Sequence, residues 1–440
     1  MVKAKTKLDF AISGFPEYTP EVRDVELKWL NQLSKLFESY GYASIETPSV
    51  EKVETLAAKG EDVDKEIYAL RRLADDGDSK AKYALHYDMT VPTARYVAKH
   101  HGQLTFPFKR YQMQRAWRGE RPQEGRFREF TQCDIDVIDS ESVSLAYDGE
   151  MLEIAAAAFG LLETGPVRFQ VSNRRLMNGL GEALGLADAT LLARILDKVD
   201  KLTTEQLSTR LSTELELDQA GIDTCIAFSQ IRGNAGDIEN GLARLGLMND
   251  HIREGQQQLC DTLESVEKSR PEQVEILGDL SISRGFDYYT GVVYEAKFID
   301  FPDYPSICAG GRYENLVGSF MRRKLPGVGI SIGHTRIFTK LLKEGLLDVG
   351  RKTPTQVLVA SDAPDNYSTL TATAARLRQL GWNAETLPGV AKLDKQLKYA
   401  NNKGIPFVWI IRDGAAFLKN METGDQQSVD LGSFSGTPQG

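Results

Sequence analysis

The chain has 440 residues, of which 41% are hydrophobic and 26% are charged, and its formal net charge is −9. This length exceeds what one ordinary hydrophobic core supports, so we expect two or three domains. The acidic balance argues against a protein that coats nucleic acid by bulk electrostatics, while it allows a local basic site.

Cysteine usage and hydropathy narrow the class further. The four cysteines lie far apart with no CxxC pair, which predicts neither a zinc site nor a disulfide framework and suits a reducing compartment. No apolar run approaches the length of a bilayer, and the N-terminal MVKAKTKLDF lacks a signal core. We therefore expect a cytoplasmic protein that does not enter a membrane.

The first third of the chain mixes helix and strand patterns. Apolar residues at three- and four-residue spacing predict an amphipathic helix over 20–41 that stops at Gly41, and YASIETPSV then forms a short β-rich run ending at Pro48. Residues 106–138 alternate on a period of two around the polar loop GERPQEG, which predicts an antiparallel hairpin. MLEIAAAAFGLLETG, from residue 151, returns to helical spacing.

In the remainder of the chain the composition and the secondary-structure pattern change twice. Residues 176–275 are rich in Leu and Glu and hold 9 Lys+Arg against 18 Asp+Glu, which indicates a separate acidic helical insertion. Strand character returns at 281–299, followed by the Gly-rich CAGGRYENLVGSF. After the polar break DVGRKTPT, strands and helices alternate, which predicts a small α/β domain with a largely parallel sheet.

The stretch WRGERPQEGRFREFTQCDID, residues 117–136, carries the strongest chemical signal. Alternate side chains of a strand share one face, and here that face runs from cations through an aromatic ring to carboxylates, with Arg118 across the loop. Guanidinium groups fit phosphate oxygens, an aromatic ring can stack on a purine, and carboxylates hold a cationic or N–H-donating group. The face is therefore suited to a nucleoside triphosphate beside an amine-like molecule. Its residues are Arg126, Arg128, Phe130, Gln132, Asp134 and Asp136.

A plainer interpretation stays open for each of these features. The hairpin could be solvated, with Glu124 and Glu129 neutralising its arginines in surface ion pairs. The tyrosine pair in SRGFDYYTG could be core aromatics, and the glycines of CAGGRY could mark a bulge or turn instead of a close approach. Arg336, on the first turn of the helix after LPGVGISIG, could be an ordinary surface residue.

Taken together and in this order, the segments resemble class II aminoacyl-tRNA synthetases, and within them the histidyl-tRNA synthetases. The stretch ending in TPSV resembles motif 1, the dimerisation element, WRGERPQEGRFREF resembles motif 2, and GVGISIGHTRI resembles motif 3. SRGFDYYTG and CAGGRY are similar to two peptides peculiar to histidyl enzymes. The resemblance covers nearly the whole chain, including KLDKQLKYANNKGIPFVWII, which is similar to the family's anticodon-binding module.

The resemblance implies an α+β catalytic domain on a mostly antiparallel sheet, an all-helical insertion and a C-terminal α/β anticodon-binding domain. The expected boundaries are 1–175 and 276–350 for the two parts of the catalytic domain, 176–275 for the insertion and 351–440 for the anticodon-binding domain. The implied reaction joins L-histidine to the 3′-terminal adenosine of tRNA(His) through a histidyl-adenylate. It uses ATP and Mg²⁺ and is carried out by a homodimer.

Residue roles also follow from the resemblance. Arg118 and Arg284 would be catalytic, as cations at the substrate carboxylate and the α-phosphate. Glu120 and Phe130 would hold the adenine, Arg126 the phosphates, and Arg336 the γ-phosphate while it stacks on the base; these four and Arg118 make the ATP site.

The α-amino group of histidine would be bound by Asp88, Thr90 and Gln132, and the imidazole by Asp136 and Tyr289, with Tyr288 near. Together with Arg118 and Arg284 these form the histidine site, and no protein ligand of a metal is assigned.

The chain departs from the family pattern in places. His86 stands where members usually carry an arginine, and Tyr87, Asp88 and Met89 are closer to the archaeal and eukaryotic pattern. Two alternatives stay open: a non-catalytic regulatory subunit of ATP phosphoribosyltransferase, and a class II synthetase for another amino acid. The intact last domain and histidine-specific peptides argue against the first, and the tyrosine pair argues against the second.

Overall fold

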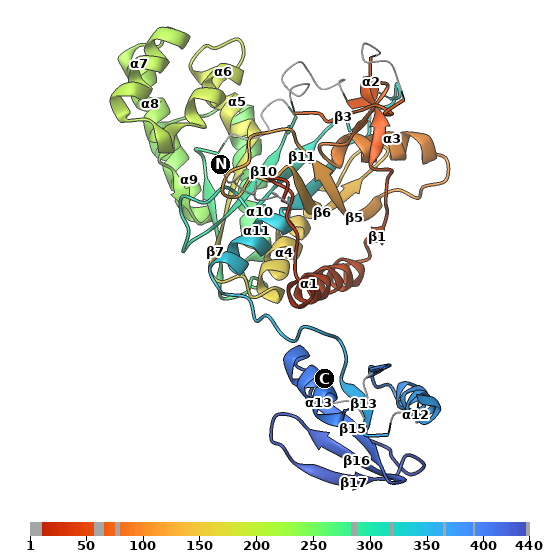
Figure 1. The fold of residues 1–440 in the computed structure, drawn as a ribbon. Helices are drawn as coiled ribbons and strands as arrows, with labels where there is room; N and C mark the ends of the chain where they lie inside the picture. Colours follow the sequence, from red (N-terminus) through yellow and green to blue (C-terminus); the bar gives the residue numbers. More distant parts are fainter. Residues whose placement is uncertain are drawn as a thin grey trace, which may run out of the picture. The chain divides into compact units, whose positions relative to one another are not determined.

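The computed structural model describes residues 11–56, 66–74, 80–282, 288–316, 318, 320–363, 367–389 and 392–436. The chain divides into two compact units, residues 1–16 with 29–346 and residues 17–28 with 347–440. Each unit has its own sheet (Figure 1). The finer division of the larger unit, at residues 176 and 276, stays a prediction.

The larger unit is built on a sheet that has nine strands within the described residues, in the order β1-β5-β6-β12-β11-β10-β7-β9-β8. Neighbours pair antiparallel except β1 with β5 and β7 with β9, so the predicted mostly antiparallel sheet is confirmed. The strands are β1 (Ala43–Ser44), β5 (Phe108–Trp117), β6 (Glu129–Ile138), β7 (Val167–Asn173), β8 (Arg232–Gly233), β9 (Val274–Asp279), β10 (Val292–Phe298), β11 (Cys308–Tyr313) and β12 (Gly327–Ile332).

One face of this sheet carries the apolar core. Cys133, Ile135 and Val137 of β6 are fully buried there. The helices α4 (Ala146–Leu161), α10 (Asp250–Val266) and α11 (His334–Lys343) pack against the sheet (Figure 1). The Phe159 ring of α4 contacts the Phe169 ring of β7 edge to face at 5.5 Å. Because side chains alternate along a strand, Gln132, Asp134 and Asp136 are turned to the opposite face.

The predicted N-terminal helix is α1 (Pro20–Ser39), followed by Gly41 at φ +82°, a backbone conformation that favours glycine. The run after it forms only the two-residue β1. It then enters a small sheet with the order β2-β4-β3, which the sequence pattern did not reveal because its strands are very short. The elements of this region are β2 (Val50–Lys52), α2 (Val53–Leu56), β3 (Ala69–Leu70), β4 (Tyr83–Leu85) and α3 (Thr90–His100).

The acidic segment is helical, apart from the short β8, which joins the edge of the large sheet, and the first two residues of β9, which begins at Val274. Side chains close its helix ends: Thr203 and Gln206 form a capping box on α7, and Asn234 and Asp237 form another on α9. These reciprocal bonds explain why the helices begin where the sequence places Thr or Asn. The helices here are α5 (Arg174–Ala183), α6 (Thr190–Leu196), a 3₁₀ turn (Val199–Lys201), α7 (Thr204–Leu215), α8 (Gln219–Ser229), α9 (Ala235–Leu245) and α10.

The C-terminal unit carries a sheet in the order β14-β13-β15-β16-β17. The predicted α/β domain is confirmed, but the prediction of a largely parallel sheet is wrong, because β15, β16 and β17 pair antiparallel after the parallel β14-β13-β15 core. Their runs AAFLKN and QQSV are too polar to signal strands. The elements are β13 (Val357–Ser361), α12 (Tyr367–Gln379), β14 (Ala384–Thr386), α13 (Leu393–Lys403), β15 (Phe407–Arg412), β16 (Ala415–Asn420) and β17 (Gln426–Val429).

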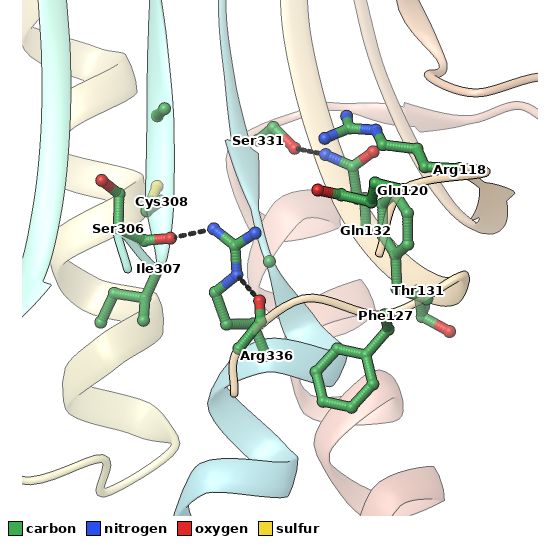
Figure 2. A pocket seen from close by; sticks show the side chains of 14 residues that line it. Arg118, Glu120, Phe127, Thr131, Gln132, Ser306, Ile307, Cys308, Ser331 and Arg336 are labelled. Atoms are coloured by element: carbon green, nitrogen blue, oxygen red, sulfur yellow. Dashed lines mark hydrogen bonds between the residues drawn. The ribbon is translucent and has the colours of Figure 1, made fainter. Parts of the chain in front are cut away.

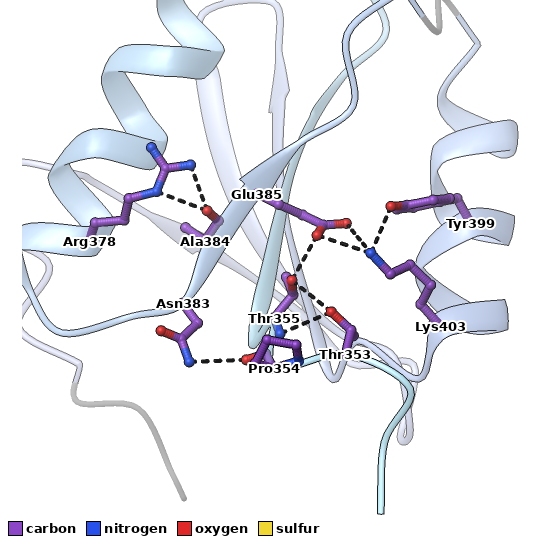
Figure 3. Close-up of polar contacts among 9 residues, drawn as sticks. All are labelled: Thr353, Pro354, Thr355, Arg378, Asn383, Ala384, Glu385, Tyr399 and Lys403. Carbon is purple, nitrogen blue, oxygen red and sulfur yellow. Dashed lines mark hydrogen bonds and ion pairs between the residues drawn. The ribbon is translucent and has the colours of Figure 1, made fainter. Parts of the chain in front are cut away.

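A half-buried polar cluster joins three parts of this unit (Figure 3). Glu385 of β14 accepts hydrogen bonds from Thr355 Oγ1 at 2.7 Å and from Lys403 Nζ of α13 at 3.2 Å, and Lys403 also donates to Tyr399 at 2.8 Å. These partners hold the pKa of Glu385 below its usual value against the effect of burial. The cluster fixes α13 against the edge strand.

Candidate active site

The polar face of the hairpin is set by its register. Arg110 pairs with Asp136, Gln112 with Asp134, and on the other side of β6 Ser331 of β12 is the neighbour of Asp134. Directly paired residues of antiparallel strands point to the same side, so these polar side chains form rows across β5, β6 and β12. The predicted hairpin is thus confirmed, and its polar face continues into β12.

A cavity of about 190 Å³ opens at one end of this face. Figure 2 shows Arg336 on one side of it and Arg118, Glu120 and Gln132 on the other. Predicted ATP-site residues therefore meet in one cavity. Its lining is Arg118, Glu120, Gly125, Phe127, Phe130, Thr131, Gln132, Ser306, Ile307, Cys308, Ala309, Ser331, Gly333 and Arg336.

Arg118 lies where the cavity meets the part of the polar face that leads toward Asp136. Its Nε donates to the Tyr87 carbonyl at 3.1 Å, and its guanidinium carbon is 5.0 Å from the centroid of the Phe130 ring. The backbone bond and the ring contact hold a planar cation at a fixed place, and its terminal N–H groups, which bond to no described residue, can bind an anion.

Arg336 closes the other wall. Its Nε donates to the Gly125 carbonyl at 2.7 Å, and Nη1 donates to the Ser306 carbonyl, so one side chain joins the tip of the hairpin loop to the segment before β11 (Figure 2). Burial, and then the nearby charges of Arg118 and Arg126, lower the pKa of Arg336. Several cations that raise one another's energy are the arrangement expected where an anion binds.

The remaining arginines of the hairpin differ from the sequence prediction. β6 begins at Glu129, so Arg126 and Arg128 lie in the loop and not on the strand face. Arg126 is half exposed, lies outside the lining of the cavity, and pairs with Glu120 at 3.2 Å. The prediction failed because an isolated bridge between Gln123 and Arg126 folds the loop back and interrupts the alternation.

The plainer interpretation of the hairpin as a solvated surface also fails for its two named acids. Glu129 pairs with Arg115 at 3.1 Å and accepts from Trp117 Nε1, and Glu124 pairs with Lys343 at 2.8 Å. Neither acid pairs with Arg118 or Arg126 among the described residues.

The middle of the face holds two buried acceptors without donors. Gln132 donates through Nε2 to Ser331 Oγ at 2.6 Å, but its Oε1 and the Oδ1 of Asp134 have no hydrogen-bond partner in the described part of the chain. Burial raises the pKa of Asp134 to about 7, against the opposing effects of Arg110 and Ser331. Buried acceptors of this kind require a donor that the described protein does not supply.

The deep end of the face centres on Asp136. Its carboxylate forms an ion pair with Arg110 Nη2 and accepts from Tyr313 Oη at 3.0 Å. Burial raises its pKa, while Arg110 and Tyr313 lower it. Gly329 lies beneath: a Cβ there would overlap Asp136 Oδ1 and approach the Ile135 carbonyl to 2.8 Å. The glycine is required for this close approach of β12.

The two tyrosines of the histidine-specific peptide lie beside this carboxylate. The Tyr288 ring contacts the rings of Tyr289 at 5.1 Å and Tyr313 at 5.2 Å, and the charge of Asp136 adds to burial in raising the pKa of both Tyr288 and Tyr289. The Tyr289 ring covers Gly311, where a Cβ would come within 2.7 Å of it. Both tyrosines line a second cavity, of about 320 Å³, with Arg174, Arg175, Asn178, His251, Thr290 and Glu314.

Asp88 and Thr90 are carried by a segment that is docked on β5. His86 is fully buried; its Nε2 donates to the Arg115 carbonyl at 2.6 Å, and its own carbonyl accepts from Trp117 N. Asp88 Oδ1 accepts from Val91 N at 3.1 Å at the start of α3. Burial is the main cause that raises the pKa of Asp134 and of Tyr289, and Asp88 is close enough for its charge to add to this effect. His86 therefore fills the place of the usual arginine as a structural anchor.

One predicted catalytic residue lies beyond these observations, because Arg284 falls in 283–287, outside the described residues. Among the residues that are described, no group of three or more His, Cys, Asp or Glu side chains could hold a metal ion. The four cysteines are buried, and none of them is in a disulfide within the described residues. No helix in the described ranges is long and apolar enough to cross a membrane.

Sequence reasoning missed several residues of this site, notably Arg110, Tyr313 and Ser306. Arg110 had only a partial signal, because a hairpin symmetrical about GERPQEG places it opposite Asp134, whereas the actual register pairs it with Asp136. Tyr313 and Ser306 reach the site from β11 and the segment before it, and no local pattern in the sequence marks such a meeting.

Comparisons with known proteins agree with this geometry. A family model for histidyl-tRNA synthetase matches residues 14–337. A histidine–tRNA ligase of Thermobifida fusca (strain YX) is 47% identical over 435 residues, which cover 97% of this chain and 98% of the relative.

Solved structures give the same result for the fold. The crystal structure of histidyl-tRNA synthetase from Nostoc sp. PCC 7120 matches with a TM-score of 0.85 at 35% identity, covering 96% of this chain and 97% of that one. An ATP phosphoribosyltransferase regulatory subunit/histidyl-tRNA synthetase from Bacillus halodurans C matches with a TM-score of 0.75 at 20% identity over 92% of this chain and 98% of that one, which shows the fold alone. With the family model and the near full-length relatives, these matches establish that the chain belongs to the histidyl-tRNA synthetase family.

Proposed function

We propose that the cavity between Arg118 and Arg336 binds ATP and that the inner face of β6 binds L-histidine, so that the two substrates lie end to end. The observation that carries this proposal is the single polar surface of β5, β6 and β12, on which the cavity and Asp136 lie at successive positions. As a histidyl-tRNA synthetase, the chain joins histidine to tRNA with ATP as the energy source.

In this arrangement the adenine stacks between Phe130 and Arg336 and contacts Glu120 at the rim of the cavity. Arg336 also reaches the γ-phosphate, and Arg126 reaches the phosphates from the loop when Glu120 releases it. Arg118 contacts the α-phosphate and the histidine carboxylate. The support is that Arg118, Phe130 and Arg336 line one cavity and that both arginines are fixed by backbone carbonyls.

The histidine would extend from the cavity toward Asp136. Asp88, Thr90 and Gln132 receive its α-amino group, and Asp136 and Tyr289 bind the imidazole with Tyr288 against it. A site that hydrogen-bonds its substrate rejects an apolar analogue because its own polar groups are then left buried without partners. Asp136→Ala should therefore weaken the preference for histidine over phenylalanine and glutamine, and an unchanged preference would refute the imidazole assignment.

The reaction has two steps. The histidine carboxylate attacks the α-phosphorus of ATP, which forms the acyl-phosphate bond of histidyl-adenylate and breaks the bond to pyrophosphate. The ribose hydroxyl of the terminal adenosine of tRNA(His) then attacks the carbonyl carbon and releases AMP. Negative charge gathers near one phosphorus in both steps, so fixed guanidinium groups provide catalysis by position and electrostatics. We assign this role to Arg118 and to Arg284.

Mg²⁺ would add charge neutralisation at the phosphates. Because the described residues offer no cluster of ligands, we propose that it is held mainly by phosphate oxygens and water, as is common for this ion. Glu120 is the one carboxylate among the described residues that line the cavity.

We further propose a cytoplasmic homodimer with an insertion at 176–275 and an anticodon-binding domain at 351–440. The small sheet next to the motif 1 segment exposes Val50, Leu70 and Tyr83 to extents of 41%, 36% and 53%. A second copy of the chain would cover this apolar surface, in keeping with the role of motif 1 as the dimerisation element of the family. Sedimentation of the purified protein as a monomer at micromolar concentration would exclude this proposal.

Histidine-dependent ATP/pyrophosphate exchange tests the assignment of the catalytic residues. Arg118→Ala and Arg284→Ala should each slow adenylate formation by several hundredfold or more, on the order of the loss from removing one preorganised charge-stabilising group. Arg168→Ala, in an exposed pair with Glu275, is the matched control and should leave the rate unchanged. Exchange with each amino acid in turn also separates this function from a regulator, which would show none, and from a synthetase of another specificity.

A further inference from the structure

Asp134 is a buried acid to which the proposed mechanism gives no role. It lies on the inner face of β6 between Gln132 and Asp136, and it is only 7% exposed. Its Oδ1 has no hydrogen-bond partner among the described residues. An acceptor in such a place costs free energy until a donor fills it, so the site is built for a group that arrives from outside.

The groups that face Asp134 leave an excess of negative charge. Arg110 of β5 is the cation that acts on it, and this guanidinium already forms the ion pair with Asp136. Asp136 and Asp88 both act on Asp134 as like charges, while Ser331 of β12 donates a hydrogen bond. Cys308 of β11 and Tyr289 lie nearby; burial raises the pKa of both, and the charge of Asp134 adds to this effect. A bound cationic group would offset this excess of negative charge.

A second unfilled acceptor lies next to Asp134. The Oε1 of Gln132 is buried and lacks a donor among the described residues, because the amide nitrogen is used on Ser331. The two residues share one face of β6, about 7 Å apart along the strand. Gln132 lines the proposed ATP cavity, so the acceptors of Gln132 and Asp134 lie where this cavity meets the polar face of β6.

We propose that Asp134 is a further histidine-binding residue, whose Oδ1 accepts a hydrogen bond from the α-ammonium group of the substrate beside Gln132 Oε1. This rests on the proposed placement of histidine along β6. An ammonium group has N–H donors for both orphan acceptors, and its charge offsets the negative charge of Asp88 and Asp134. Asp134 thus selects for an α-amino acid, while Asp136 selects for the imidazole.

The assignment separates ligands by the group that they lack. Imidazolelactate has the imidazole and carboxylate of histidine with a hydroxyl in place of the amine, and histamine keeps the amine and imidazole without the carboxylate. In Asp134→Asn, the inhibition constant of histamine and the KM of histidine should both rise about tenfold to a hundredfold, the usual range for a lost charged hydrogen bond. The inhibition constant of imidazolelactate and the KM of ATP should change less than about twofold.

The matched control is Asp139→Asn. Asp139 follows directly after β6 and is partly exposed, and its Oδ1 accepts a hydrogen bond from Ser140 N. It lines neither the ATP cavity nor the second cavity. This variant should leave all four constants unchanged. Equal effects of Asp134→Asn on histamine and imidazolelactate, or no effect on either, would overturn the proposal.

Wild-type protein gives an independent measurement that does not depend on a variant. At pH 7 part of the Asp134 population carries a proton, and an incoming ammonium group would displace it. Calorimetric titration with histidine, in buffers of different ionisation enthalpy, should therefore detect more proton release, or less uptake, for the wild type than for Asp134→Asn. Identical proton linkage in the two proteins would contradict the ammonium contact. If wild-type exchange with histidine were itself absent, the proposed function would fail instead.

Discussion

Arg110 of β5 and Asp136 of β6 occupy paired positions of the hairpin and form an ion pair in which the arginine side chain is 2% exposed. Tyr313 completes the arrangement from β11. A charge this deeply buried is held in place only by its partner. The pair therefore fixes the carboxylate to which we assign the imidazole of the substrate.

Arg110→Leu should lower the free energy of unfolding by about 3 kcal/mol, because it leaves Asp136 buried without its counter-charge. Urea denaturation followed by circular dichroism measures this. Arg168→Leu removes an exposed arginine of the same unit and should cost less than about 1 kcal/mol. The double variant Arg110→Leu/Asp136→Leu should regain much of the stability while it remains unable to select histidine. A double variant as active as the wild type would refute the role of the pair.

Gly329→Ala should impair histidine binding more than ATP binding. The added Cβ would overlap the Asp136 carboxylate and press on the Ile135 carbonyl, and both belong to the strand that carries the site. We expect the KM of histidine to rise by about tenfold or more, since one misplaced buried hydrogen bond to a charged group has that cost. At Gly102 an added Cβ meets nothing within 4 Å, so Gly102→Ala is the control and should behave as wild type.

Arg336→Lys should raise the KM of ATP by about tenfold, although the charge is kept. The guanidinium donates to the Gly125 and Ser306 carbonyls at once, and a lysine cannot reproduce that planar fork. Lys343→Ala removes the exposed partner of Glu124, about two turns of α11 after Arg336, and should leave the KM of ATP unaltered. Exchange kinetics at varied ATP would detect the difference, and equal KM values for Arg336→Lys and wild type would argue against nucleotide contact.

The stability of the wild type should depend on pH through Asp134. Burial raises its pKa in the folded protein to about 7, well above the value in the unfolded chain, which is about 3.9. Between these values the folded state holds a proton that the unfolded state has lost, so the contribution of Asp134 to stability is present at low pH and is lost as the pH rises toward 7. Relative to Asp134→Asn, the wild type should become less stable from pH 4 to 7. Parallel stability curves for the two proteins would contradict this assignment of the pKa.

The sequence predicted the parts of the site that depend on local pattern. Alternation along β6 correctly placed Phe130, Gln132, Asp134 and Asp136 on one face, because that strand is continuous and its period is fixed by geometry. Alternation failed at Arg126 and Arg128, where the chain leaves the strand and folds back at Gln123.

Contacts between residues far apart in the chain could not be predicted from the sequence pattern. Ser306 and Arg336 come together only because β11 and β12 are neighbours in the sheet, and Tyr313 reaches Asp136 across β12. The strands β2, β3 and β4 contain two or three residues each, which is too few for periodicity to reveal.

A crystal structure of the protein with histidinol and ATP bound would test the central claim most directly, since histidinol lacks the carboxylate and cannot form the adenylate. We predict the adenine between Phe130 and Arg336, the amine beside Gln132 and Asp134, and the imidazole at Asp136 and Tyr289, all on the shared face of β5, β6 and β12. Electron density that places the imidazole away from Asp136, or the two ligands in cavities that do not connect, would contradict the account.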